Sequence, residues 1–256
     1  MPVVKQPEVV TFAISSAHDM LPDPDDKACA KAWFDANFPD VPREIWSRME
    51  HYVDMLLAEA QHQNLIAAST IGNVWTRHIV DSLQLLLLVP ASYASQPWLD
   101  VGSGAGLPAI PVALCRSGAV HCIESRALRC AFLRQTADML GLSPQMSVHE
   151  MPAAQCNLAP ISIISARAFA PLPKLLAQIN RFSNAQTIWV LPKGKNAATE
   201  VSMLSQNQQQ MFHVKPSVTD AAAQILVAKG RFNLEIAAAR YRKAKGKQIQ
   251  KRANMS

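Results

Sequence analysis

Hydrophobic positions repeat with a helical period in the first third of the chain. After Pro42 the apolar residues recur every three or four positions, as on one buried helix face: Ile45, Met49, Tyr52, Val53, Leu56, Leu57 and Ala60. Proline suits a first helical turn, and Thr70 is predicted to cap a second helix that ends near Leu83. We therefore predict an N-terminal helical subdomain over residues 31–90. Residues 1–30, with prolines and aspartates near residues 22–26, are predicted to be a poorly ordered leader.

From Trp98 onward, short β-rich runs alternate with helical stretches. The β-rich runs are residues 98–101, 119–123, 146–149, 161–165, 187–191, 211–216 and 224–228. The clearest helical stretches between them are residues 108–115, 127–140, 172–181 and 198–210. This alternation predicts an α/β domain over residues 91–230 with a mostly parallel seven-stranded sheet and right-handed crossovers. The last two runs are predicted to form a terminal hairpin.

The sharpest local signal is a glycine-rich turn after the first predicted strand. Residues 98–108 read Trp-Leu-Asp-Val-Gly-Ser-Gly-Ala-Gly-Leu-Pro, with glycines at 102, 104 and 106. A dinucleotide fingerprint would need a glycine at 107, where this chain has leucine. Asp100 precedes the first glycine by two residues, and Glu124 closes the next strand, where a carboxylate can accept both ribose hydroxyls of an adenosine. The acid-x-Gly-x-Gly-x-Gly pattern resembles the S-adenosylmethionine turn of Rossmann-like methyltransferases. We therefore expect S-adenosylmethionine rather than a dinucleotide, and a cofactor site rather than a turn that serves only strand–helix packing.

Missing motifs narrow the chemistry that such a site can perform. The segment after the fourth strand reads Ser-Ala-Arg-Ala-Phe-Ala-Pro-Leu over residues 165–172, without the Pro-Pro-aromatic motif usual for methylation of an exocyclic amine. Methylation at C5 of a pyrimidine needs a cysteine nucleophile, and Cys156 precedes the fourth strand. A ring nitrogen such as guanine N7 has its own lone pair and needs placement more than a base. The sequence is therefore compatible with N7 methylation.

Charge and cysteine content refine this interpretation. The whole chain carries +6 and the segment from Lys229 to the end carries +8, so residues 1–228 carry −2. Seven of those positive charges lie in the tail at residues 240–252, where they indicate either a solvated end or contacts with nucleic-acid phosphates. The five cysteines include no C-x-x-C pair, and the histidines form no ligand cluster, so we expect reduced thiols, no metal and a cytoplasmic location without membrane association.

Several segments together resemble the bacterial small-subunit ribosomal RNA guanine-N7 methyltransferases, the glucose-inhibited division protein B type, over about residues 52–230. The resemblance is carried by Asn64-Leu65, Arg77-His-Ile-Val-Asp-Ser82, Asp100–Pro111, Arg129, Phe132-Leu-Arg134, Arg167-Ala-Phe-Ala170 and Lys193-Gly194. It implies a Rossmann-like class I methyltransferase that uses S-adenosylmethionine. Its expected partner is small-subunit ribosomal RNA or a 30S-type particle.

The resemblance also implies roles for individual residues. Gly102, Gly104 and Leu107 would line the methionine and ribose part of the cofactor, and Glu124 would hold the ribose. The backbone around Pro152 and Ala153 would flank the adenine. Arg167 would stand near the cofactor carboxylate or the target base, and Lys193 would face the same cleft; these two are the candidate catalytic residues.

Two other functions remain open at this point. A methyltransferase acting on a small molecule would suit the nearly neutral body of the chain. A non-catalytic ribosome-assembly factor that keeps the fold would suit the loop Met151-Pro-Ala-Ala154, which lacks the arginine and acids usual in the family. Binding of S-adenosylmethionine and methyl incorporation into ribosomal RNA separate these alternatives.

The residues 231–256 form the predicted basic tail and lie beyond the segments that carry the resemblance.

Overall fold

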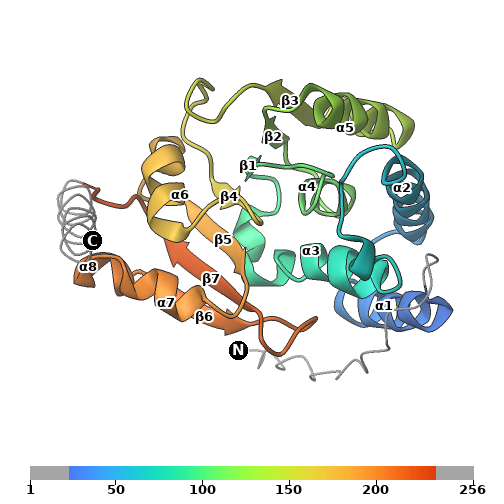
Figure 1. Cartoon of the computed structure of the whole chain (residues 1–256), viewed down its shortest axis with the longest axis horizontal. Coiled ribbons are helices and arrows are strands. Elements are labelled where there is room, and N and C mark those ends of the chain that lie inside the picture. The colour runs from blue at the N-terminus through green and yellow to red at the C-terminus, as the bar shows by residue number, and fades with distance from the viewer. Residues whose placement is uncertain (1–22, 235–256) are drawn as a thin grey trace, which may run out of the picture.

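The computed structural model of the chain describes residues 23–234, and these fold around one seven-stranded sheet (Figure 1). Its strands are β1 (Trp98–Val101), β2 (Val120–Glu124), β3 (Met146–Glu150), β4 (Ile163–Ser165), β5 (Ile188–Lys193), β6 (Phe212–Pro216) and β7 (Gln224–Lys229). They are ordered β3-β2-β1-β4-β5-β7-β6. The first five are parallel, and β7 runs antiparallel to both β5 and β6. The predicted mostly parallel sheet and its terminal hairpin are confirmed.

Helices cover both faces of the sheet and enclose two cores. The helices are α1 (Pro24–Asn37), α2 (Glu44–Glu59), a π-helical segment (Trp75–Val80), α3 (Asp81–Leu83), α4 (Ala109–Leu114), α5 (Ala127–Met139), α6 (Leu172–Ile179), α7 (Ala197–Ser202) and α8 (Gln206–Gln209). One core joins the helices from α1 to α5 to the face that carries Trp98 and Ile163. The other joins α6 and α7 to the face that carries Leu99 and Ile164. Neighbouring strand residues alternate between the two cores, as the pleat of a strand requires.

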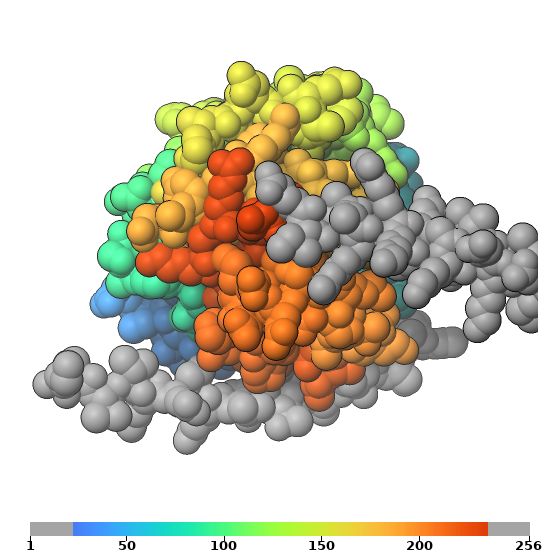
Figure 2. Space-filling view, turned by 90° about the vertical axis from the view of Figure 1, so that its left-hand side faces the viewer, coloured from blue at the N-terminus to red at the C-terminus, as the bar shows by residue number. Residues whose placement is uncertain are grey.

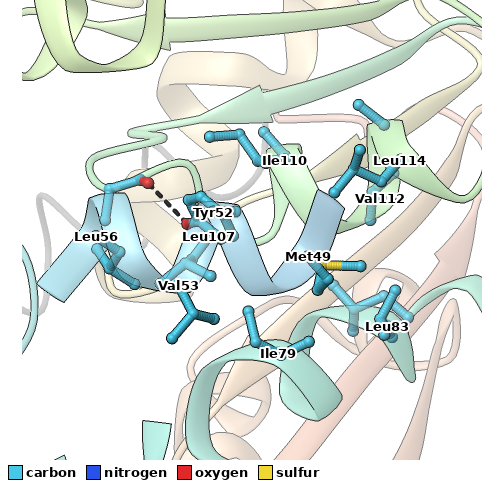
Figure 3. Close-up of a cluster of buried hydrophobic side chains, with 14 of the residues drawn as sticks. Met49, Tyr52, Val53, Leu56, Ile79, Leu83, Leu107, Ile110, Val112 and Leu114 are labelled. Carbon is cyan, nitrogen blue, oxygen red and sulfur yellow. Dashed lines mark hydrogen bonds between the residues drawn. The ribbon is translucent and has the colours of Figure 1, made fainter. Parts of the chain in front are cut away.

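The N-terminal helices share their core with the sheet. Figure 3 shows Met49, Tyr52 and Leu56 of α2 packed against Ile79 and against residues of α4 and the turn before it. Residues 31–90 therefore form a layer on the sheet that is continuous with its core. Residues 24–30 form the first half of α1, so the predicted poorly ordered leader does not extend over them.

The start of the segment Trp75–Val80 differs from the prediction that Thr70 caps it. The Asp26 carboxylate, carried by α1, accepts hydrogen bonds from the backbone N–H groups of Trp75 (2.9 Å) and Thr76 (3.2 Å). Those N–H groups have no partner within a helix, so an acid from elsewhere can replace a local cap. The Thr70 hydroxyl instead donates to the Ala67 carbonyl at 2.7 Å, so the predicted cap is wrong.

The predicted helix over residues 198–210 is two helices. The first ends at Ser202, and Ser205 caps the second through a capping box, in which its backbone N–H donates to Gln208 Oε1 at 3.0 Å. Figure 2 shows the edge of the molecule where α7, α8 and the β6–β7 hairpin lie together, in orange and red.

None of the helices within residues 23–234 is long and apolar enough to cross a membrane.

Candidate methyltransferase site

The glycine-rich turn between β1 and α4 adopts a backbone that favours glycine. Gly102, Gly104 and Gly106 have φ angles of +75°, +55° and +89°. A Cβ atom on Gly106 would also lie 2.3 Å from Ile110 Cδ1, so this glycine allows the turn to pack on α4. A Cβ on Gly104 would meet nothing closer than 3.6 Å, so there the requirement is one of conformation rather than of space.

Tyr52 of α2 fixes the turn from the helical layer. Its hydroxyl donates to the Ala105 carbonyl at 2.8 Å, shown as the dashed line in Figure 3, and its side chain is fully buried. Burial raises the pKa of Tyr52, so the phenol stays protonated and remains a donor. The same layer also contacts α5, because Arg129 Nη2 donates to the Asn64 carbonyl at 2.8 Å. The N-terminal layer thus contributes to the shape of the glycine-rich turn.

Glu124 at the end of β2 is held in one orientation by backbone donors. Its carboxylate is buried, and it accepts N–H groups from Ser125 (2.8 Å) and Arg126 (3.0 Å) on Oε1 and from Gly104 (3.0 Å) on Oε2. The bond to Gly104 ties the end of β2 to the turn after β1. A carboxylate offers about four acceptor sites, so Glu124 keeps one, on Oε2, for a ligand hydroxyl.

A cavity of about 310 Å³ opens beside these residues, at the carboxyl ends of β1, β2 and β4. Four of the predicted cofactor residues line it: Gly102, Glu124, Pro152 and Ala153. Ala168 and Phe169, which follow β4, line it as well. Ligands of open α/β sheets bind at this end of the strands.

Gly104 and Leu107 take other places in the site. Gly104 acts on the cavity through its N–H bond to Glu124. Leu107 is 4% exposed and packs in the core beside Tyr52, as Figure 3 shows. Its predicted role in lining the cofactor stays a prediction, while its described contacts are with the helical layer.

Asp100 lies behind the turn as a buried carboxylate. It is 1% exposed, and its Oδ1 accepts the Ser165 hydroxyl at 2.7 Å. Its Oδ2 has no hydrogen-bond partner among the described residues. Burial raises the pKa of Asp100 to about 6, and the hydrogen bond from Ser165 opposes that rise. An unpaired buried oxygen of this kind fits a ligand that brings a positive charge to the turn.

Arg167, two residues past the end of β4, is held by the segment Trp75–Val80 and by α3. Its guanidinium nitrogens lie 3.3 Å from His78 Nδ1 and 3.3 Å from Asp81 Oδ2. Burial first, and then the Arg167 charge, lower the pKa of His78 to about 3. Neutral His78 can therefore accept from Arg167 at Nδ1 and donate from Nε2 to the Thr70 hydroxyl, 2.8 Å away.

Lys193 at the end of β5 anchors the segment after β4. Its ammonium donates to the Ala170 carbonyl at 2.9 Å and forms an ion pair with Glu200 at 2.8 Å. Glu200 also accepts the backbone N–H of Leu172 at 2.6 Å. Lys193 is not among the residues that line the cavity, and its contacts with Ala170 and Glu200 position residues 170–172.

Sequence reasoning did not assign a role to His78, Tyr52 or Phe169. Their signals were present in part: His78 stands in the Arg-His-Ile-Val-Asp-Ser segment and Phe169 in the Arg-Ala-Phe-Ala segment. Tyr52 appears in the sequence only as one member of an apolar helix face. Within residues 23–234, no group of three or more His, Cys, Asp or Glu residues could hold a metal ion.

Solved structures with the same fold are methyltransferases. An O-methyltransferase from Bacillus cereus, solved in complex with SAH, has a TM-score of 0.52 at 13% identity, covering 78% of this chain and 97% of that one. A putative O-methyltransferase from Klebsiella pneumoniae has a TM-score of 0.51 at 16% identity, covering 79% and 96%. The chain therefore has the Rossmann-like α/β fold of these class I enzymes.

Sequence comparison gives the particular family. The family model described as rRNA small subunit methyltransferase G matches residues 45–227. The ribosomal RNA small subunit methyltransferase G of Sphingopyxis alaskensis is 45% identical over 216 residues, covering 84% of this chain and 90% of that protein. That of Novosphingobium aromaticivorans is 46% identical over 184 residues, covering 72% and 80%. The chain belongs to the rRNA small subunit methyltransferase G family, which confirms the predicted family and enzyme class.

Proposed function

We propose that the protein transfers a methyl group from S-adenosylmethionine to N7 of a guanine in small-subunit ribosomal RNA. The observation that carries this proposal is the cavity at the carboxyl ends of β1, β2 and β4, in a chain of this family. When bound, S-adenosylmethionine supplies an electrophilic methyl group. The chain supplies the binding surface, the orientation and the exclusion of water.

The residues of the cavity fit such a cofactor. Glu124 is oriented by three backbone donors and keeps an acceptor site for a ribose hydroxyl. The unpaired Asp100 Oδ2 favours the positive charge of the cofactor near the turn. Pro152 and Ala153 offer apolar and backbone surface for the adenine. These roles extend the family resemblance to the positions that line the site.

The nucleophile in this reaction is the guanine itself. N7 carries a lone pair and no proton, so the enzyme needs no general base there. Its task is to hold N7 in line with the methyl group, a positional effect of the kind that accounts for much of enzymatic catalysis. We propose that Arg167, anchored by His78 and Asp81, contributes to this placement. The guanine must be unpaired or flipped out of a helix to enter the cavity.

Two basic regions suit an RNA partner. Arg126 and Arg129 line the cofactor cavity and also a second cavity of about 280 Å³ with Gln63 and Asn64, so they stand where RNA would enter.

The tail at residues 240–256 lies outside the described residues, and we propose that it contacts phosphates. Deleting residues 240–256 should weaken RNA binding and flatten its salt dependence by about 0.7–0.9 in the log–log slope per lost phosphate contact. An unchanged slope would make the tail a solvated end.

The test of the function is to map N7-methylguanine in small-subunit RNA from cells with and without the protein. Calorimetry with S-adenosylmethionine and methyl incorporation into purified RNA complete it. A methylated guanine that depends on the protein supports the proposal. Incorporation only into metabolites would favour a small-molecule methyltransferase, and absent cofactor binding would favour an assembly factor.

We also propose a cytoplasmic location, consistent with the five free cysteines Cys29, Cys115, Cys122, Cys130 and Cys156.

A further inference from the structure

Phe169 places an aromatic ring in the wall of the cofactor cavity. It follows β4, it is half-buried, and it lines the cavity together with Ala168 and Gly102. A Cβ atom added to Gly102 would lie 2.6 Å from Phe169 Cδ2, so the ring rests directly on the first glycine of the turn. An aromatic side chain therefore occupies the wall between the cofactor turn and the segment after β4.

The distances show which part of the ring rests on Gly102. From the same Cβ position, the two ring atoms bonded to Cδ2, namely Cε2 and Cγ, are both 3.5 Å away. If the ring lay flat on Gly102, these two atoms would be only slightly farther than Cδ2. Instead, Cε2 and Cγ are both clearly farther from the Cβ position than Cδ2 is, and by the same amount. This is expected when the Cβ position lies in the plane of the ring, directly beyond Cδ2. Phe169 thus meets Gly102 with the edge of its ring rather than with a face.

The backbone on both sides of Phe169 is anchored. Arg167 is bound to His78 and Asp81, and the Ala170 carbonyl is bound by Lys193. Between them Ala168 has a φ of +51°, a left-handed conformation that is strained for alanine. Strain of this kind persists where surrounding contacts enforce it, often at functional sites. The chain therefore anchors the backbone on both sides of Phe169 rather than leaving it on a free loop.

We propose that Phe169 is the platform on which the target guanine stacks during methyl transfer. This inference rests on the proposed function and names the residue that would contact its substrate base. A purine presents a flat π-face, and aromatic side chains that bind unpaired bases do so through stacking. An upright ring on the cofactor turn would hold the base beside the methyl donor. Phe169 would thereby replace the aromatic residue of the motif that this chain lacks after its fourth strand.

The test compares Phe169→Leu with Phe169→Trp, using Phe38→Leu as a matched control. Phe38 is another half-buried phenylalanine, at the end of α1, and it does not line the cofactor cavity. The substrate is small-subunit RNA from cells lacking the protein. We expect Phe169→Leu to lower kcat/KM for this RNA by about tenfold to a hundredfold, because stacking on the base is lost. Its affinity for S-adenosylmethionine, measured by calorimetry, should stay within about threefold.

The variants also distinguish stacking from simple packing. Phe169→Trp should retain most of the activity, because indole stacks while leucine only fills volume. Phe38→Leu should leave kcat/KM per folded protein unchanged. Equal activity of Phe169→Leu and wild type would overturn the proposal, and so would a loss of cofactor affinity as large as the loss of kcat/KM. If wild type itself forms no N7-methylguanine, the proposed function fails, and the same variants measured by equilibrium RNA affinity still decide whether Phe169 stacks on a base.

Discussion

Replacing Asp100 with asparagine tests the consequences of a buried carboxylate behind the glycine-rich turn. Asp100 is 1% exposed, and only its Oδ1 has a partner, the Ser165 hydroxyl. Burial raises the pKa of Asp100 from its ordinary value of 3.8 to about 6. Asparagine has nearly the same shape and can still accept the Ser165 hydroxyl, so the substitution removes the charge and changes little else.

The sign and size of the effect follow from proton linkage. Between the unfolded pKa of 3.8 and the folded pKa of about 6, the native state binds more protons at Asp100 than the unfolded state does. The free energy of unfolding of the wild type therefore falls as pH rises through this window, by about 3 kcal/mol from this group. The Asp100→Asn variant lacks this pH-dependent contribution to the free energy of unfolding. Its stability relative to wild type should rise by about 3 kcal/mol between about pH 3 and pH 8.

Other groups titrate in the same pH range, so the assay compares the free energy of unfolding of the Asp100→Asn variant with that of the wild type at each pH. His78, whose pKa is lowered to about 3, loses native-state stabilisation as pH falls below its ordinary 6.5, and it does so in both proteins. Urea denaturation of both proteins across this pH range cancels that contribution. Ser165→Ala serves as a control that removes the hydrogen bond and keeps the charge. A difference between asparagine variant and wild type that does not change with pH would refute the reasoning.

Three further substitutions test the arrangement around the cavity. Arg167→Ala should lower methyl transfer about tenfold, the effect of one charged hydrogen bond, with lysine only partly restoring it; wild-type rates in the alanine variant would contradict this. Gly104→Val should cost about 1–2 kcal/mol in urea denaturation, because its φ is +55°, and should weaken calorimetric cofactor binding through Glu124; unchanged binding in a folded variant would remove this turn from the site. Tyr52→Phe should lower the free energy of unfolding by about 1–3 kcal/mol, since the buried Ala105 carbonyl loses its donor, and an equally stable variant would show that this bond is dispensable.

The sheet could be predicted from sequence because each strand carries its own signal. The runs at residues 98–101 and 224–228, for example, are bounded by turns and correspond to β1 and β7 within a residue or so. The glycine-rich turn was equally visible, since positive φ angles at Gly102 and Gly104 leave a direct trace in residue type. Local conformation, where it restricts the residue, can be recovered from the sequence alone.

Long-range partners leave no comparable trace. Asp26 caps a helix that begins 49 residues later, and Arg167 meets His78 across 89 positions. Only the fold brings these groups together, so sequence reasoning assigned Thr70 to the cap and left His78 without a role. The same limit explains Lys193: its place at the end of β5 was predictable, whereas its bonds to Ala170 and Glu200 depend on how α7 packs.

The N-terminal helical layer is best understood as a part of the site. Its contacts reach three separate regions: Tyr52 binds the glycine-rich turn, His78 binds Arg167 after β4, and Asp81 accepts the Thr219 hydroxyl at 3.0 Å from the β6–β7 connection. The first two regions follow β1 and β4, where Gly102, Ala168 and Phe169 line the cavity, and the third is the hairpin connection between β6 and β7. Because the layer also shares a continuous core with the sheet, it cannot be removed without exposing buried side chains on both. The geometry of the turn and of Arg167 therefore depends on helices that precede the whole α/β domain in sequence.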